Sequence, residues 1–273
     1  MSKPFSIKDL DDTQAPLLDH LIELRKRLVR AVGALLVAFA GCMYFAKDIF
    51  GFLVMPLTAA FPDGEGRLVY TKLYEAFFVE IKVALFAAFC ISFPVIANQL
   101  WAFIAPGLYA KEKKAFLPFL LATPVLFTMG ASLAYFVVMP TAFVWFLGFQ
   151  GEVAGLTAEA LPAMGDYLDL VMHFILAFGI SFLLPVLLLL LNTAGIVTRA
   201  QLSAGRRYVI VGVFVIAAVA TPPDVVSQLL LAIPLMLLFE ASMVLMLFGE
   251  RKRAREAAAA EAEIGTEVAI SGE

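Results

Sequence analysis

Long uninterrupted runs of apolar residues dominate the pattern along this chain, and the polar and charged residues gather between them. A bilayer core of about 30 Å needs roughly 20 apolar residues in a helix, because each residue adds about 1.5 Å. We predict six membrane spans, at residues 28–45, 76–97, 116–138, 170–191, 208–220 and 225–248. The pattern therefore indicates an all-α polytopic membrane protein.

The last two predicted spans are shorter and less regular than the others. Residues 208–220 are uncharged but reach only about 20 Å as a helix, and the turn TPPD follows at 221–224. The two segments are either short spans that thin the bilayer locally or a hairpin that does not cross it. We favour short spans, because non-helical backbone at the Pro-Pro turn must avoid lipid and should reach the outer interface.

The basic residues predict the orientation. Residues 1–30, 100–115, 194–207 and 249–273 together hold sixteen Lys and Arg, whereas the intervening loops hold three. Cytoplasmic loops carry the excess of Lys and Arg, so both termini are expected in the cytoplasm. The expected organisation is a cytoplasmic amphipathic segment (1–27), a six-span membrane domain (28–248) and a charged cytoplasmic tail (249–273).

Composition agrees with this class and narrows the chemistry. Hydrophobic residues make up 62% of the chain and charged residues 16%, whereas soluble domains are about half apolar and a quarter charged. The mean hydropathy is +0.91. No phosphate-binding glycine loop is present, and His20 and His173 stand apart from any cluster of metal ligands. We therefore expect no catalytic site, no metal, no cofactor and no nucleic-acid partner.

The segment before the first span is predicted to be an amphipathic helix. Its leucines at 17, 21, 24 and 28 follow helical spacing. Glu23 and Arg27 are four residues apart and fall on one face. They form either an ordinary helix ion pair, with a contribution of a few tenths of a kcal/mol, or part of a functional surface.

Other charged and aromatic residues fall at or inside the predicted spans. The aromatic residues Trp101, Phe103 and Tyr109 suit the headgroup layer. Glu112 follows them as the single acid among three lysines. Taken by itself, Glu112 is an ordinary surface glutamate. Ionisable residues within spans are costly to bury, and they face protein or water or extend to the interface. This applies to Glu80, Lys82 and Glu240.

Four motifs resemble those of the TatC family, the multispanning core of the twin-arginine protein translocase. They are HLIELRKRL at 20–28, WAFIAPGLY at 101–109, AYFVVMP at 134–140 and TPPDVVSQ at 221–228. The resemblance runs from about residue 14 to 250, in the same order and spacing. It implies export of folded proteins whose signal peptides carry two adjacent arginines, across the bacterial cytoplasmic membrane and driven by the proton-motive force.

The resemblance also implies site residues. Glu23 and Glu112 match the acids that contact the arginine pair, and Arg25 and Phe103 match positions that shape that site. A planar guanidinium can donate two hydrogen bonds to one carboxylate, whereas a lysine presents a compact charge. The implied scaffold is a concave cup open to lipid. It fits the prolines in or near spans, which tend to bend helices: Pro94, Pro118, Pro124, Pro185 and Pro234.

Partners follow from the resemblance as well. In members of the family, single-span membrane proteins of the TatA and TatB type dock near the last two spans. The resemblance therefore implies such partners and a multimeric complex. Thr221 and Gln228 match positions near that contact, where neutral polar groups could bond a membrane-embedded acid of the partner.

One position departs from the family pattern. Many members carry an acid in the fourth span, in a Phe-Glu-x-Pro setting, whereas residues 181–185 here read SFLLP with Leu183 at that place. Our hypothesis is that this homologue works without an acid there. The alternative function is a secondary transporter of a small solute, a class that usually has repeated halves and charged or broken helices near the midplane. The chain shows no convincing internal repeat.

Overall fold

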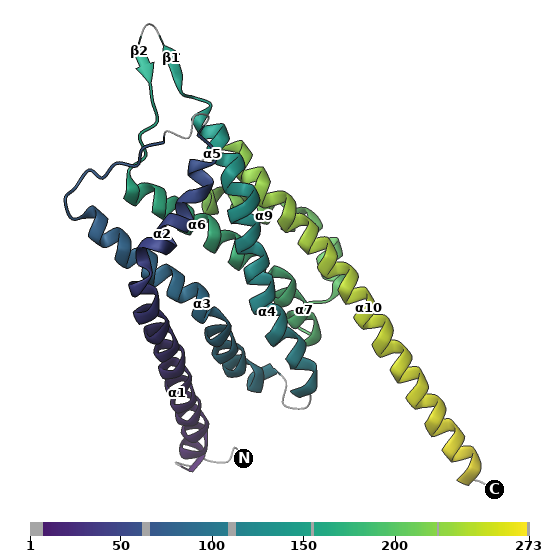
Figure 1. Cartoon of the computed structure of the whole chain (residues 1–273). Coiled ribbons are helices and arrows are strands. Elements are labelled where there is room, and N and C mark those ends of the chain that lie inside the picture. The colour runs from purple at the N-terminus through teal and green to yellow at the C-terminus, as the bar shows by residue number, and fades with distance from the viewer. Residues whose placement is uncertain (1–7, 62–65, 109–112, 154–155, 223, 272–273) are drawn as a thin grey trace.

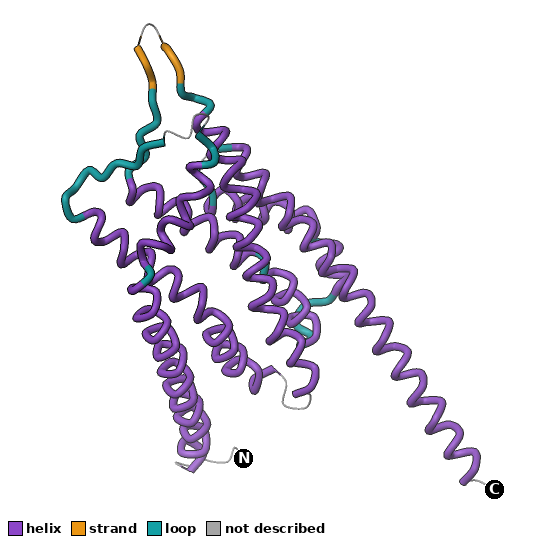
Figure 2. Tube along the Cα trace, in the orientation of Figure 1, coloured by secondary structure: helices purple, strands orange, loops and turns teal. Residues whose placement is uncertain are grey.

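The computed structural model describes residues 8–61, 66–108, 113–153, 156–222 and 224–271, and most of them are helical (Figures 1 and 2). The elements in chain order are α1 (Lys8–Tyr44), α2 (Ala46–Thr58), α3 (Glu75–Leu108), α4 (Lys113–Leu133), the π-helical turn η1 (Ala134–Val138), α5 (Met139–Leu147), β1 (Gly151–Val153), β2 (Leu156–Ala158), α6 (Met164–Ser181), α7 (Leu184–Thr193), α8 (Arg199–Ala204), α9 (Arg206–Ala220) and α10 (Val225–Ser271).

Five stretches among these residues are long and apolar enough to cross a bilayer. They are His20–Tyr44, Glu75–Phe103, Phe119–Leu147, Met164–Thr193 and Val225–Arg251. Each contains most of one predicted span, and the third continues through η1 and α5, further than predicted. The 15 residues of α9 reach about 22 Å, short of a bilayer core. A polytopic all-α membrane protein is thus confirmed, whereas the count of six spans stays a prediction.

The start of α1 and the end of α10 lie at the same end of the molecule, and the hairpin β1–β2 lies at the opposite end (Figure 1). We call these the termini end and the hairpin end. In the hairpin the strands are antiparallel, with Gly151 opposite Ala158. Helices α1 and α10 diverge towards the termini end (Figure 1). The side of the membrane on which the termini end lies stays a prediction.

Helix α6 lies at the centre of the core. Four of its side chains are fully buried, and they recur at the helical spacing that places them on one face: Leu168, Val171, Phe174 and Phe178. They pack with buried residues of α2, α3, η1, α5, α9 and α10 in one continuous cluster. The main core therefore forms around α6, whereas α1 packs on α3 through a separate cluster that includes Cys42, Ala84 and Ala88.

Small residues allow α4 and α6 to cross closely. A Cβ atom added to Gly130 of α4 would lie 2.4 Å from the carbonyl oxygen of Phe178, and one added to Gly179 of α6 would lie 2.6 Å from the Phe127 ring. Membrane helices have no hydrophobic force between them, so close backbone approach through small residues is a main source of packing. The α4–α6 crossing depends on these two glycines.

Two prolines follow interruptions in the helices. Helix α6 ends at Ser181, and α7 begins at Leu184 with Pro185 in its first turn. Helix α5 likewise has Pro140 in its first turn, directly after η1. Proline lacks an N–H donor and suits the first turn of a helix, where that donor has no partner. The bend predicted at Pro185 is therefore present as a break in the helix at residues 182–183.

Candidate functional site

The predicted amphipathic segment is the first part of α1, which runs on without interruption into the first span. Its Glu23 accepts two hydrogen bonds from Arg27, 3.0 Å from Nε and 2.5 Å from the terminal guanidinium nitrogen. Both bonds go to Oε1, and no described residue bonds Oε2. The ion pair considered from the sequence is therefore present, and it leaves Oε2 without a partner among the described residues.

A ring stack joins α1 to α3 one turn before Glu23. The centroids of the His20 and Phe103 rings are 4.3 Å apart, with an interplanar angle of 25°. These two residues belong to the first and second sequence motifs, which are more than 80 positions apart in the chain. Packing of α1 on α3 therefore brings the two motifs together, and His20 is a site residue that the sequence pattern did not single out.

The predicted site residues differ in how they are placed. Phe103 is partly buried beside His20, and Arg25 is exposed on α1. Glu112 lies outside the described residues. The second motif is also tied to α4, because the buried indole of Trp101 donates a hydrogen bond to the Thr123 hydroxyl at 2.8 Å. Neighbouring elements thus fix the second motif on both sides.

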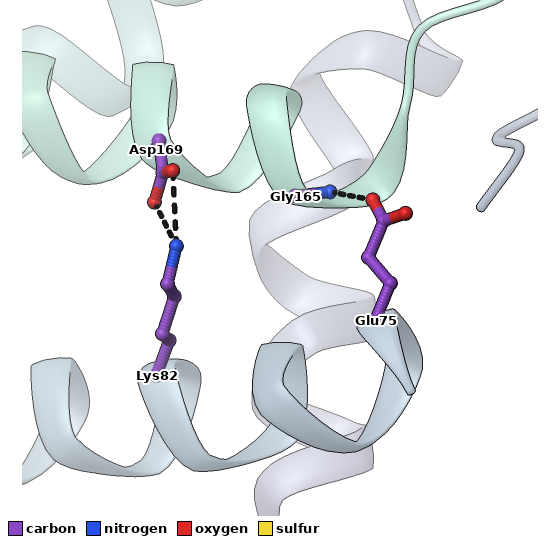
Figure 3. Close-up of polar contacts among 4 residues, drawn as sticks. All are labelled: Glu75, Lys82, Gly165 and Asp169. Atoms are coloured by element: carbon purple, nitrogen blue, oxygen red, sulfur yellow. Dashed lines mark hydrogen bonds and ion pairs between the residues drawn. The ribbon is translucent and has the colours of Figure 1, made fainter. Parts of the chain in front are cut away.

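The two charged residues singled out in the second span each have a countercharge nearby. Lys82 of α3 donates to both carboxylate oxygens of Asp169 on α6, at 2.8 and 3.0 Å (Figure 3). Glu80 lies 4.0 Å from Lys47 of α2. These two groups face protein, as their cost in lipid requires. Asp169 was not singled out from the sequence, although its place directly before an apolar run was a usable signal.

Two further ion pairs hold α10. Arg206 at the start of α9 donates to Glu240 at 3.0 Å, and Arg199 of α8 donates to Glu250 at 3.0 Å. Glu240 therefore finds its countercharge on α9. Because α8 and α9 come immediately before the final hairpin, both pairs fix α10 against the segment that precedes it.

Glu75 adds a second link between α3 and α6 at the hairpin end. Its Oε1 accepts from the Gly165 amide at 2.9 Å (Figure 3), and its Oε2 accepts from the amides of Thr71 and Lys72 at 2.8 and 3.3 Å. A carboxylate that accepts several amide hydrogens anchors the chain on either side of it. The starts of α3 and α6 are therefore held together.

The two predicted partner-contact residues bond within the chain. The buried Thr221 hydroxyl donates to the Ala217 carbonyl at 2.8 Å, and the Gln228 side-chain amide donates to the Phe214 carbonyl at 3.2 Å. Both bonds go to α9. The Gln228 side chain keeps a second N–H and its carbonyl oxygen, so it retains hydrogen-bonding groups for another molecule.

The turn between α9 and α10 holds polar atoms that the sequence analysis did not assign. Asp224 caps α10, with its Oδ1 accepting from the Ser227 amide at 2.7 Å. Its Oδ2 and the Ser227 hydroxyl are buried and have no partner among the described residues. An aspartate directly before an apolar run was a recognisable start signal for the helix.

Known proteins resemble this chain over most of its length. The family described as "Sec-independent protein translocase protein (TatC)" matches residues 19–234. The chain belongs to the TatC family. It is 51% identical over 252 residues to the TatC protein of Magnetococcus marinus, covering 92% of this chain and 91% of that one. The TatC protein of Escherichia coli is 43% identical over 231 residues, covering 85% and 87%.

A solved TatC structure has the same fold. A crystal structure described as the twin-arginine translocase receptor TatC in DDM superposes with a TM-score of 0.72 at 41% identity, covering 83% of this chain and 99% of that one. The chain is therefore a TatC component of a Sec-independent, twin-arginine translocase complex and a multi-pass protein of the bacterial inner membrane. Neither these relatives nor this fold support the solute transporter.

Proposed function

We propose that this TatC protein is the receptor for twin-arginine signal peptides and a scaffold of the translocase that exports folded proteins. The observation that supports this best is the Glu23 carboxylate, which lies in the first motif next to the His20–Phe103 stack. Its Oε2 has no partner in the part of the chain that the structure describes. The transport uses the proton-motive force, and we assign the chain no catalytic step.

A guanidinium of the signal peptide is the group that best fits this carboxylate. Arg27 already holds Oε1 and thereby limits the rotation of the Glu23 side chain. The second oxygen accepts a charge-assisted hydrogen bond from the peptide, which contributes about 1.5–3 kcal/mol. A guanidinium can also stack its plane on a neighbouring ring, which an ammonium does less well. The site thus favours arginine over lysine.

The other predicted residues complete this site. Phe103 supplies the apolar wall, and its ring is held in place by His20. Arg25 is exposed and shapes the entrance through its own charge. Glu112 is proposed as the acceptor for the second arginine, which rests on the family resemblance. A second acid gives each guanidinium a countercharge of its own.

The partners are proposed to be TatA- and TatB-type single-span proteins on α9 and α10. Only Val213 and Ala217 of α9 are buried, and an apolar stripe is exposed on its other side at Val211, Val215 and Val219. These valines recur every four residues, as the face of a helix that packs on another helix does. Gln228 offers its remaining polar groups next to that stripe.

Binding of a twin-arginine peptide to the protein in lipid nanodiscs tests the receptor role. Wild type should bind the arginine pair tightly and a twin-lysine version poorly. Glu23→Gln should weaken binding by about tenfold to a hundredfold, as the loss of one charge-assisted hydrogen bond requires. Glu112→Ala should weaken it as well. Equal binding of both peptides by all these proteins would contradict the receptor role.

Glu250→Gln is the matched control. Glu250, like Glu23, pairs with an arginine and is partly exposed, but the pair joins α10 to α8. Peptide affinity should stay unchanged in this variant. For the partner surface, a cysteine at Val215 should crosslink to a single-span partner more strongly than one at Val37, which is even more exposed, on α1.

A further inference from the structure

A polar cavity of about 270 Å³ opens at the hairpin end, between the first turns of α3 and α6. Its charged walls carry two cations and three acids from both helices and from the segment that precedes α3: Lys72, Lys82, Glu75, Asp166 and Asp169. The site proposed for the signal peptide involves none of them. The cavity therefore requires an explanation of its own.

Three of the five charges are satisfied within the protein. Lys82 and Asp169 neutralise one another through two hydrogen bonds (Figure 3). Glu75 is occupied by amide donors on both of its oxygens. The remaining two, Lys72 and Asp166, are exposed, and neither has an ion pair or side-chain hydrogen bond with a described residue. The Lys72 ammonium lies over the Tyr74 ring, 5.9 Å from its centroid, and this contact leaves its N–H donors without an acceptor among the described residues. The cavity thus offers one cation and one carboxylate without a countercharge in the described part of the chain.

Glu75 fixes the spacing between these two groups. One of its oxygens accepts from the backbone amide of Lys72, and the other accepts from Gly165, the residue before Asp166. The backbone that carries each free charge is therefore anchored to the same carboxylate. A ligand that bridges the walls therefore meets two groups whose backbone is already held in place, so that mainly their side chains must be ordered on binding.

The cavity lies at the level expected for lipid headgroups. Exposed aromatic side chains surround the start of α3, at Tyr74, Phe77 and Phe78, and aromatic residues gather at membrane–water interfaces. Phe78 also lines the cavity. Leu85 follows it seven residues later on nearly the same face of α3 and is exposed as well. Lys82 lies between them on that face, but its charge is neutralised by Asp169. The exposed side of α3 therefore offers apolar contacts on either side of a neutralised pair.

We propose that this cavity binds the headgroup of a zwitterionic phospholipid of the phosphoethanolamine type, in the leaflet at the hairpin end. The Lys72 ammonium contacts the phosphate, and the Asp166 carboxylate accepts hydrogen bonds from the primary amine. One acyl chain follows Phe78 and Leu85. A phosphoglycerol headgroup has no cation for Asp166, and a phosphocholine headgroup has no N–H to donate. The protein therefore selects the amine-bearing lipid.

Native mass spectrometry of the delipidated protein in DDM tests this with phosphatidylethanolamine, phosphatidylcholine and phosphatidylglycerol added separately. The ethanolamine lipid should bind with the lowest apparent Kd. Lys72→Gln and Asp166→Asn should each raise that Kd about threefold to tenfold, as for a partly exposed charged contact. The matched controls are Arg67→Gln and Asp48→Asn, which remove exposed charges outside the cavity and should leave the Kd unchanged.

Three results would overturn the proposal. Equal lipid binding by the Lys72 and Asp166 variants would remove the site. Preference for phosphatidylglycerol would leave a phosphate site without the amine contact. Binding of inorganic phosphate with the same dependence on Lys72, and without selection among the lipids, would make the ligand a free anion. Twin-arginine peptide binding, measured on the same samples, should be unchanged, so failure of the lipid site is distinct from failure of the receptor role.

Discussion

The imidazole of His20 stacks on the phenyl ring of Phe103 with the ring centroids 4.3 Å apart, and this contact joins α1 to α3 at the start of the first span. Glu23 follows one helical turn later on α1. Any displacement of α1 from α3 therefore moves the proposed acceptor relative to the proposed apolar wall. The stack positions the signal-peptide site, although His20 itself need not contact the peptide.

The His20→Ala variant should weaken binding of the twin-arginine peptide by about twofold to tenfold, because an aromatic pair contributes about 0.5–1.5 kcal/mol. His20→Phe keeps a ring and should restore most of the affinity. His173→Ala is the control, since it removes the other histidine, which is exposed on α6. Titration of labelled peptide into nanodiscs gives the Kd. Unchanged affinity in His20→Ala would mean that the stack does not position Glu23.

The Lys82–Asp169 pair should couple α3 to α6. In a double-mutant cycle of Lys82→Gln and Asp169→Asn, the coupling free energy should be about 0.5–1 kcal/mol, because the pair is half exposed. Thermal unfolding in nanodiscs measures it. The effects of Arg206→Gln and Glu240→Gln on the unfolding free energy should add to those of the first pair without coupling, since that second pair joins α9 and α10. Strict additivity within the first cycle would show that the two charges act separately.

The sequence was sufficient for the parts of the fold that depend on local composition. The cost of placing polar backbone and charge in lipid predicts where spans lie, and five of the six appear as long apolar helices. Helix α2 and the hairpin β1–β2 were not predicted, because they lie between spans, where hydropathy carries little information. The break before Pro185 was predictable as a bend but not as a stop at Ser181.

The candidate site was predictable only in part, for a related reason. The Glu23–Arg27 pair is a contact between neighbours on one helix, so spacing alone indicates it. Lys82 and Asp169 are 87 residues apart, and His20 and Phe103 lie on different spans. Contacts of this kind depend on which faces of two helices meet. That choice is made by packing, for example by the close approach at Gly130, which a sequence pattern does not reveal.

The α4–α6 crossing should be sensitive to a single methyl group. Gly130→Ala places a Cβ against the Phe178 carbonyl oxygen, so the two helices must separate, at a cost of about 1–3 kcal/mol of unfolding free energy. Gly33→Ala in α1 is the control, because a Cβ there meets nothing within 4 Å. That variant should be neutral or gain up to about 1 kcal/mol from higher helix propensity. Equal melting temperatures for the two variants would contradict the close crossing.

Leu183 is the position at which this chain departs from the family pattern, and its environment is apolar. Its partly buried side chain packs against a cluster that includes Phe93, Phe127 and Val186. A glutamate there would lose that packing and place a carboxylate among apolar side chains, at a cost of about 1–3 kcal/mol even with partial hydration. The native surroundings of Leu183 are therefore unfavourable for an acid.

Leu183→Glu should consequently fail to raise export of a folded twin-arginine reporter and should lower the melting temperature. Leu183→Gln separates charge from polarity, because glutamine has the same shape as glutamate without the ionisable group. Both variants should export at or below the wild-type rate when accumulation outside the cytoplasm is measured at matched protein levels. A large gain in Leu183→Glu, absent from Leu183→Gln, would show that the missing acid limits this homologue and would contradict our hypothesis that it works without one.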